Sequence, residues 1–374
     1  MYFHLILTDN CNLCCSYCRA KAFLDLDESE GERNLIVDGS LPVELDYDLD
    51  SLYSFLKKDP SPTLTFYGGE PLLRSDLIER IVREAPVRRF MMQTNGILLD
   101  RLPPEVINRF VNILVSLDGC RELTDSNRGS GVYDRVMENI QTIRARGYSG
   151  ELIARMTVTE RTDITRAVHH LAENPDYPFS SIHWQVDANF AGDYDIRGFA
   201  DWARNSYNPG IQQLARDWVD HMKREGEVLK WYPFLDPVED LLLGRKSRLR
   251  CGSGYANYSI MTDGNIGPCP VMIGMNQYYV GHIFWSDPLK LGEVPVGGEC
   301  TDCRIRTFCG GRCLYSNITQ PWGSAERRMV CDTVENLRAT LVNALPQIQE
   351  LIDAGTITME SFSHEKYNGC EIIP

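Results

Sequence analysis

Thirteen cysteines gathered in two groups constrain this chain of 374 residues more than any other feature. Four of them fall within residues 11–18 and seven within residues 251–331, while Cys120 and Cys370 stand apart. The stretch Met1–Asn10 is too short for a secretory signal, so none is expected, and no apolar run approaches the ~20 residues that a membrane span needs. We therefore expect a cytoplasmic protein with no membrane contact, in which thiolate-metal sites are favoured over disulfides.

Composition bounds the remaining classes. A hydrophobic fraction of 43% allows a sizeable core and two or three domains. The 38 Lys and Arg are outnumbered by 52 Asp and Glu, which gives a formal net charge of -14. No basic block follows the pattern that binds a phosphate backbone, so nucleic acid is not an expected partner.

Between the two cysteine groups, short β-rich runs alternate with segments of helical period. This alternation is typical of repeated βα units around a parallel sheet. It predicts an α/β fold with a partial (β/α)6 TIM-like barrel, followed by a small cysteine-rich domain. In such barrels, functional residues lie in the loops after the carboxyl ends of the strands. The predicted strands are Tyr2–Thr8, Thr63–Tyr67, Arg89–Gln93, Asn112–Leu117, Leu152–Val158 and Ile182–Val186, and the predicted helices include Leu49–Lys58, Asp76–Glu84, Tyr133–Arg146 and Ile164–Glu173.

Four segments follow from these patterns. The acidic stretch Asp25–Asp46 has no clear period and is interpreted as a surface insertion in the first segment. An amphipathic helix is expected near Thr333–Ala354. The predicted segments are residues 1–195 (partial barrel), 196–250 (bridging helical region), 251–335 (auxiliary-cluster domain) and 336–374 (C-terminal helix and tail).

The first cysteine group has the spacing C-x3-C-x2-C. One loop of this length can wrap Cys11, Cys15 and Cys18 around a single inorganic cluster. Three ligands leave one iron open to a small molecule, which a four-cysteine electron carrier does not. The alternative is a zinc loop, for which paired C-x2-C units are expected.

This motif, directly after a first barrel strand and with Tyr17 before its last cysteine, resembles that of the radical S-adenosylmethionine (radical SAM) superfamily. The resemblance implies that Cys11, Cys15 and Cys18 hold a [4Fe-4S] cluster whose open iron chelates SAM. Reductive cleavage of SAM then gives a 5′-deoxyadenosyl radical that abstracts hydrogen from a substrate. By the same resemblance Tyr17 lies beside the adenine, while Cys14 falls outside the pattern and is expected to be a small buried residue.

Other strand-end motifs extend the resemblance. Gly68-Gly69-Glu70-Pro71 is similar to the family's GGEP loop, whose glycines allow the backbone to approach the SAM amino group. Ser116 and Arg128 match positions that contact the SAM ribose and carboxylate, and Asn95 and Arg155 lie at strand ends where SAM contacts also occur. The implied SAM-binding residues are Tyr17, Gly68, Gly69, Glu70, Asn95, Ser116, Arg128 and Arg155.

The second cysteine group resembles the SPASM domain, an auxiliary-cluster extension of radical SAM enzymes that modify peptides and proteins. The resemblance implies two auxiliary [4Fe-4S] clusters, and therefore three clusters in the chain. A structural zinc ribbon would account for only four of the seven cysteines. One cluster would be held by Cys300, Cys303, Cys309 and Cys331, and the other by Cys251, Cys269 and Cys313.

The second of these clusters has only three evident ligands. Either Cys370 completes it or its fourth iron site is open to substrate, and the open site is the interpretation preferred here. Cys120 is either a buried residue or a hydrogen-atom donor to a substrate radical. Asp118, His183 and Asp187, near strand ends, are candidate proton-transfer groups or hydrogen-bonded structural residues.

The resemblances imply an enzyme that installs a post-translational modification on a peptide or protein by SAM-dependent hydrogen abstraction. The alternatives are a sulfatase-maturase-like oxidase of a Cys or Ser side chain and, in another class, an iron-sulfur electron carrier or redox sensor. The expected partners are a peptide or protein substrate and a one-electron reductant such as ferredoxin or flavodoxin. Only ten residues precede Cys11, so the chain either recruits a separate leader-recognition protein or holds its substrate with these domains alone.

Overall fold

The computed structural model describes residues 1–18, 37–320 and 323–374. The chain divides into two compact units, each made of separate stretches of sequence. The predicted segment boundaries at residues 195, 250 and 335 stay a prediction. The first unit contains Met1–Leu117, Thr124–Ile153 and Gly252–Val296, and the second contains Asp118–Leu123, Ala154–Cys251 and Gly297–Pro374.

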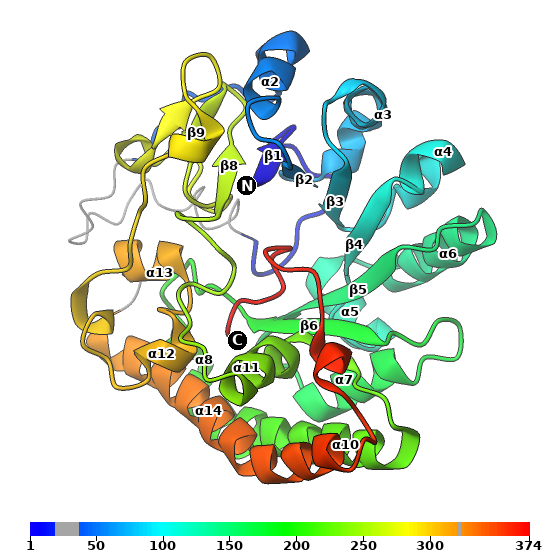
Figure 1. Cartoon of the computed structure of the whole chain (residues 1–374), viewed down its shortest axis with the longest axis vertical. Coiled ribbons are helices and arrows are strands. Elements are labelled where there is room, and N and C mark those ends of the chain that lie inside the picture. The colour runs from blue at the N-terminus through cyan, green and yellow to red at the C-terminus, as the bar shows by residue number, and fades with distance from the viewer. Residues whose placement is uncertain (19–36, 321–322) are drawn as a thin grey trace. The chain divides into compact units, whose positions relative to one another are not determined.

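A parallel sheet forms the centre of the first unit (Figure 1). Its strands β1 to β4 pair in sequence order, and each strand is followed by helical segments. The rings of Phe66, Phe90 and Phe110 lie together in the buried core of this sheet. The first four predicted strands and their parallel arrangement are therefore confirmed. The elements are β1 (Tyr2–Ile6), α2 (Leu49–Leu56), β2 (Thr63–Tyr67), α3 (Ser75–Glu84), β3 (Arg89–Thr94), α4 (Pro104–Ile107), β4 (Phe110–Ser116), α5 (Arg121–Arg128) and α6 (Val132–Ala145), with 3₁₀ turns at Pro71–Arg74 and Leu99–Arg101.

Three short strands from the cysteine-rich stretch extend this sheet, which the sequence did not predict. Strand β8 (Asn257–Ile260) pairs in parallel with β1. Strands β9 (Asn265–Gly267) and β10 (Gly281–His282) follow in antiparallel order. Runs of two to four residues are too short to show a period, so pairing with the neighbouring strand decides their conformation: β8 with β1, β9 with β8 and β10 with β9. The stretch predicted as a module of its own thus contributes strands to the first unit.

The second unit combines parallel strands with long helices. Strand β5 (Glu151–Val158) begins in the first unit and ends in the second, and β6 pairs in parallel with β7. Trp184, Trp218, Trp231 and Phe234 form an aromatic cluster in its buried core. The predicted fifth and sixth strands and the helical character of residues 196–250 are confirmed. The elements are α7 (Ile164–Ala172), β6 (Ser181–Val186), α8 (Tyr194–Arg197), α9 (Phe199–Trp202), a π-helical turn (Ala203–Tyr207), α10 (Asn208–Glu225), β7 (Lys230–Trp231), α11 (Tyr232–Leu242), α12 (Arg306–Cys309), α13 (Leu314–Thr319) and α14 (Ser324–Asp353).

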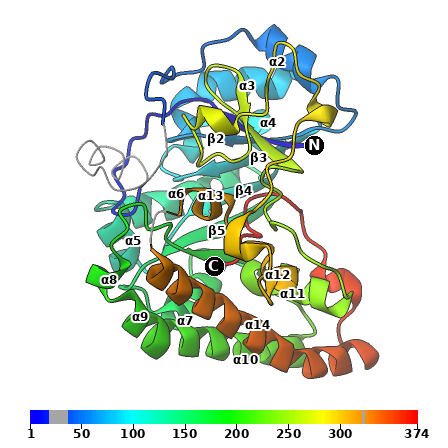
Figure 2. The same cartoon turned by 90° about the vertical axis from the view of Figure 1, so that its left-hand side faces the viewer.

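Helix α14 is longer than predicted. It begins at Ser324 rather than near Thr333, because Val330, Val334 and Leu337 continue its buried face toward the N-terminus. Cys331 therefore lies on a helix and not in a loop. Figure 2 shows α14 running beside α10, and Lys223 on α10 donates to Gln347 at 2.8 Å.

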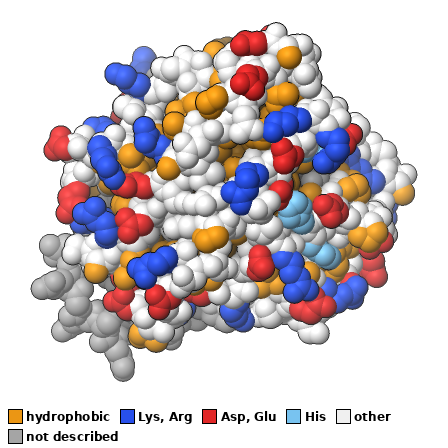
Figure 3. Space-filling model, turned by 90° about the horizontal axis from the view of Figure 1, so that it is seen from below, with side chains coloured by type: hydrophobic (Ala, Val, Ile, Leu, Met, Phe, Trp, Pro, Cys, Tyr) orange, Lys and Arg blue, Asp and Glu red, His pale blue; other side chains and the backbone are white. Residues whose placement is uncertain are grey.

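The predicted insertion Asp25–Asp46 lies partly outside the described residues. Its described end is not a free surface segment, because the main-chain N–H of Asp38 donates to the carbonyl of Gly274 at 2.7 Å and that of Asp46 to the carbonyl of Thr262 at 2.8 Å. Acidic and basic side chains are interspersed on the face drawn in Figure 3. Among the helices of the described residues, none has the length and apolar character required to cross a bilayer.

Candidate functional site

The three-cysteine loop follows the carboxyl end of β1 in the first unit. Its backbone is held at several points: the main-chain N–H of Leu13 lies 3.4 Å from Cys11 Sγ, and that of Cys18 donates to the Cys15 carbonyl at 3.1 Å. The Ser16 N–H donates to the Asn127 carbonyl at 2.9 Å. These hydrogen bonds therefore fix the backbone that carries the three thiols of the motif.

Cys14 departs from the expectation of a small buried residue. Its side chain is exposed, whereas Cys15 and Cys18 are half-buried. The prediction was wrong because it assumed a packed loop interior, and the loop instead turns this position to solvent. Cys11 is also exposed, so it is the position of Cys14 outside the C-x3-C-x2-C spacing that makes it a useful control residue.

Glu44 anchors the start of the cysteine loop. Its carboxylate accepts from Thr8 Oγ1 at 2.7 Å, from Asn10 Nδ2 at 3.1 Å and from Arg74 at 2.6 Å. These hydrogen bonds hold the pKa of Glu44 below its ordinary value, against the effect of burial. The sequence did not reveal this residue. Glu44 is one of many carboxylates in an acidic stretch without a period, and nothing in that stretch indicates contacts with residues 30 or more positions away.

The Gly68-Gly69 turn after β2 lies directly against the cysteine loop. The Gly69 N–H donates to the Thr8 carbonyl at 2.8 Å, and the Glu70 N–H to the Asn10 carbonyl at 2.8 Å. A Cβ at position 69 would stand 2.2 Å from the Asn10 carbonyl oxygen, and Gly68 has a φ of +141°. Only glycine fits this approach. Glycine is therefore required at these two positions because the turn packs directly against the backbone of the cysteine loop.

We expect Gly69→Ala to displace the cysteine loop. The added Cβ meets main-chain atoms that cannot move without breaking the Glu70–Asn10 hydrogen bond, so the free energy of unfolding should fall by about 1–3 kcal/mol. Chemical denaturation and the iron content after anaerobic reconstitution measure the effect. Gly39→Ala is the matched control, because its Cβ would meet nothing within 4 Å. Equal values for the two variants would contradict the assigned contact.

Glu70 is completely buried and connects the second and third strand ends. It accepts from Thr94 Oγ1 at 2.7 Å, from the Asn95 N–H at 2.7 Å and from the Leu72 N–H at 3.0 Å. Burial raises the pKa of its carboxyl to about 7, although these hydrogen bonds act in the opposite direction. Because both oxygens already accept from protein groups, the side chain positions the loop after β3.

Asn95 brings that loop to the cysteines. Its Nδ2 donates to Asn12 Oδ1 at 2.8 Å and lies 3.8 Å from Cys11 Sγ. Nearby, the Arg128 guanidinium lies 5.5 Å from the centre of the Tyr17 ring and is 7% exposed. Burial raises the pKa of the Cys11 thiol, whereas the Leu13 N–H and the Asn95 amide lower it. Three cysteines of one loop with these donors fit an iron-sulfur cluster, and the Arg128 cation suits an anionic ligand.

The other residues predicted to bind SAM divide between the units. Ser116 ends β4 in the first unit, together with the cysteine loop, the glycine turn, Asn95 and Arg128. Arg155 lies on β5 in the second unit, where it donates to Gln185 Oε1 at 3.2 Å. The structure therefore brings all the predicted SAM-binding residues except Arg155 into one unit, and their roles stay predictions.

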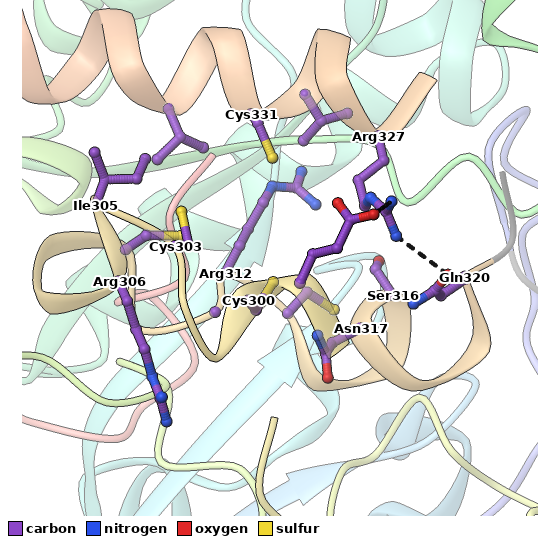
Figure 4. A pocket seen from close by; sticks show the side chains of 16 residues that line it. Cys300, Cys303, Ile305, Arg306, Arg312, Ser316, Asn317, Gln320, Arg327 and Cys331 are labelled. Atoms are coloured by element: carbon purple, nitrogen blue, oxygen red, sulfur yellow. Dashed lines mark hydrogen bonds and ion pairs between the residues drawn. The ribbon is translucent and has the colours of Figure 1, made fainter. Parts of the chain in front are cut away.

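Five of the seven cysteines of the second group line one cavity of about 80 Å³ in the second unit (Figure 4). Three of the thiols come from the loops and short helix before residue 310, and Cys331 comes from α14. Burial raises the pKa of the Cys309 thiol to about 11, whereas the nearby charge of Arg312 lowers it. Four converging thiols fit a four-iron cluster or a zinc ion. The four cysteines predicted to share one cluster, Cys300, Cys303, Cys309 and Cys331, all line this cavity, and Cys313, predicted to bind the other cluster, lines it as well.

The remaining cysteines are distributed over both units. Cys269 lies in the first unit, and Cys251, Cys313 and Cys370 lie in the second. Cys370 is completely buried within the C-terminal tail, and Cys120 is half-buried. The ligand set of the second auxiliary cluster stays a prediction.

The candidate proton-transfer groups all have structural partners. Asp118 accepts from the Thr157 N–H at 3.0 Å. Asp187 accepts from Arg197 at 2.9 Å and from the Tyr194 hydroxyl at 2.9 Å. Burial, with the charge of Arg155, holds the pKa of His183 well below its ordinary value, so this imidazole is neutral. These contacts agree with the structural interpretation.

Comparison with known proteins gives matches along most of the chain. Residues 5–169 match the model of the radical SAM superfamily. The mycofactocin maturase MftC of Mycobacterium tuberculosis (strain ATCC 25618 / H37Rv) is 30% identical over 343 residues, which are 83% of this chain and 78% of that protein. Fe-coproporphyrin III synthase of Methanosarcina barkeri is 33% identical over 146 residues, only 38% of this chain and 33% of that protein.

Solved structures agree on the fold. The structure titled native anSMEcpe with bound AdoMet has a TM-score of 0.66 and 18% identity, and covers 93% of this chain and 100% of that one. The structure of Streptococcus suis SuiB bound to precursor peptide SuiA has a TM-score of 0.51 and 17% identity, and covers 83% of this chain and 71% of that one. With the motif residues gathered after β1, β2 and β3 and a similar relative along most of its length, the chain belongs to the radical SAM superfamily and is an enzyme.

Proposed function

We propose that this enzyme cleaves SAM reductively and abstracts hydrogen from a residue of a peptide or protein substrate, to install a post-translational modification. The observation that carries the proposal is the assembly around the C-x3-C-x2-C loop. The glycine turn, Glu70, Asn95 and the Arg128–Tyr17 pair surround three thiols of one segment. A protein that only carried electrons would have no need of these surrounding groups.

Cys11, Cys15 and Cys18 would hold the [4Fe-4S] cluster. When bound, the cluster and SAM supply a 5′-deoxyadenosyl radical that abstracts hydrogen. The chain's own residues prepare the site: Glu44 fixes the loop entrance, and Glu70 fixes Asn95 next to Cys11. The buried Arg128 offers a cation for the SAM carboxylate, and the Tyr17 ring offers a face for its adenine.

The second cysteine group would form a SPASM-type region with two auxiliary clusters. The cavity in the second unit supports the first of them, with Cys300, Cys303, Cys309 and Cys331 as ligands. Cys251, Cys269 and Cys313 would hold the other, with either Cys370 or an open iron site in the fourth position. One-electron reductants such as ferredoxin or flavodoxin would supply the electrons in the cytoplasm.

A peptide substrate is supported by the relatives. MftC is named a maturase, and the SuiB structure contains a precursor peptide. A sulfatase-maturase-like oxidation of a Cys or Ser side chain is the second candidate, since the structures titled anSMEcpe, one of them with a Cp18Cys peptide, have the highest fold similarity among those described above. A separate leader-recognition protein would be expected for modification of a precursor peptide rather than for oxidation of a Cys or Ser side chain.

The test is anaerobic reconstitution followed by metal analysis and a SAM cleavage assay. We expect about 12 iron atoms per chain, the sum of three four-iron clusters, and release of 5′-deoxyadenosine under reducing conditions. Iron without 5′-deoxyadenosine would identify an electron carrier, and zinc with little iron would overturn the assignment. Substrate peptides deuterated at single positions would then show which hydrogen is transferred to 5′-deoxyadenosine.

A further inference from the structure

Arg312 occupies an unusual backbone position in the wall of the cavity lined by Cys300, Cys303, Cys309, Cys313 and Cys331. Gly310, Gly311 and Arg312 have φ values of +68°, +102° and +58° in succession. The first two positions are filled by glycine, which adopts this left-handed region freely, but arginine has a Cβ and disfavours it. Its own contacts must therefore account for the conformation.

The Arg312 side chain is buried without a protein acceptor for two of its nitrogens. It is 8% exposed, and its Nε and Nη2 have no hydrogen-bond partner among residues 1–18, 37–320 and 323–374. Figure 4 shows it extending into the space among Cys300, Cys303 and Cys331. Burial of two guanidinium nitrogens without an acceptor is costly, and an occupant of the cavity that carries negative charge would offset this cost.

The other charged groups that line the cavity do not supply this charge. Glu299 is the one carboxylate among its lining residues, and it pairs with Arg327 at 2.7 Å. Arg327 also donates to Gln320 at 3.1 Å. Arg306 is exposed and donates to the Thr301 carbonyl at 2.8 Å. Among the cations that line this cavity, Arg312 is therefore the one whose guanidinium can donate to a group bound there.

We propose that Arg312 positions and electrostatically stabilises the reduced state of the auxiliary cluster held by Cys300, Cys303, Cys309 and Cys331. The inference rests on the proposed function, because it requires an iron-sulfur cluster in this cavity. One-electron reduction, with the electron supplied by the external reductant, makes a four-thiolate cluster more negative, and a fixed cation beside its sulfurs favours that state. Arg312 therefore raises the reduction potential.

The test is a redox titration followed by electron paramagnetic resonance, with iron content measured on the same samples. It uses the Cys15→Ala background, so that signals come from the auxiliary clusters alone. In Arg312→Gln, we expect the signal of one auxiliary cluster to titrate at a more negative potential than in the background protein. The expected shift of its one-electron equilibrium is about tenfold toward the oxidised form, which corresponds to about 59 mV. Arg312→Lys should shift less, because it keeps the charge but loses the planar donor fork.

Arg327→Gln is the matched control, since it removes an arginine from the same cavity wall that already has protein partners. Its potential should shift less than that of Arg312→Gln, because Glu299 already balances the charge of Arg327. If Arg312→Gln does not retain iron, Arg312→Gly removes the same charge and suits the backbone at φ +58°. An unshifted titration in an iron-replete Arg312 variant, or an equal shift in Arg327→Gln, overturns the inference. Zinc or no metal in this cavity of the unmodified protein would instead overturn the proposed function.

Discussion

Cys15→Ala is expected to abolish SAM cleavage while leaving the auxiliary clusters in place. Three thiolates are the minimum that holds a four-iron cluster with one open site, so loss of the central ligand removes the site where SAM binds. Iron should fall from about twelve to about eight atoms per chain, one four-iron cluster fewer. Release of 5′-deoxyadenosine under reducing conditions should fall to the level without enzyme.

The adjacent Cys14 provides the control. It is exposed and outside the C-x3-C-x2-C spacing, so Cys14→Ala should retain both the iron and the cleavage activity. Comparison of the two variants distinguishes the loss of a cluster ligand from the general effect of removing a thiol from this loop. Cleavage retained in Cys15→Ala, or lost in Cys14→Ala, would contradict the ligand assignment of the first cluster.

The sequence predicted well those parts of the fold that depend on local pattern. The strand Thr63–Tyr67 has the predicted bounds, and five other strands lie within two residues of prediction at each end. A buried strand in a parallel sheet is a short apolar run, and the helix that follows shows a period of 3.6, so both signals lie within a few residues. The order of the strands follows from the short connections of βα units.

Contacts between distant segments could not be predicted in this way. Strand β8 is formed by pairing with β1, and the Glu44 carboxylate accepts a hydrogen bond from Thr8 across a stretch of sequence without a pattern. Arg312 has no motif of its own, and its role follows only from burial and from missing partners. Each of these depends on the tertiary neighbour, which a single sequence does not identify.

The C-terminal tail supplies a second expected result with a large effect. Asp236 on α11 is buried and accepts from Arg250, at 2.5 Å, and from Lys366 of the tail; His364 Nε2 lies 3.3 Å from it. Burial alone would raise the pKa of Asp236, but the His364 hydrogen bond and the two cations hold it well below its ordinary value. Asp236→Asn removes the anion that these groups share, while Arg250 keeps Asp240 at 2.8 Å and Lys366 keeps Glu239 at 2.9 Å. We therefore expect about 1–3 kcal/mol less stability, the cost of leaving buried donors without an acceptor.

The effect should depend on pH in a definite direction. Burial lowers the pKa of His364, but Asp236 raises it above the ordinary 6.5, so the His364–Asp236 pair stabilises the fold fully below pH 6.5 and less as pH rises through the folded value. Denaturation of Asp236→Asn should therefore lack this decrease, which the unmodified protein shows. Asp201→Asn is the control: its exposed carboxylate lies 3.8 Å from Arg204, a pair worth about 0–1 kcal/mol. A loss in Asp236→Asn no larger than in Asp201→Asn would mean that burial of the tail does not depend on this carboxylate.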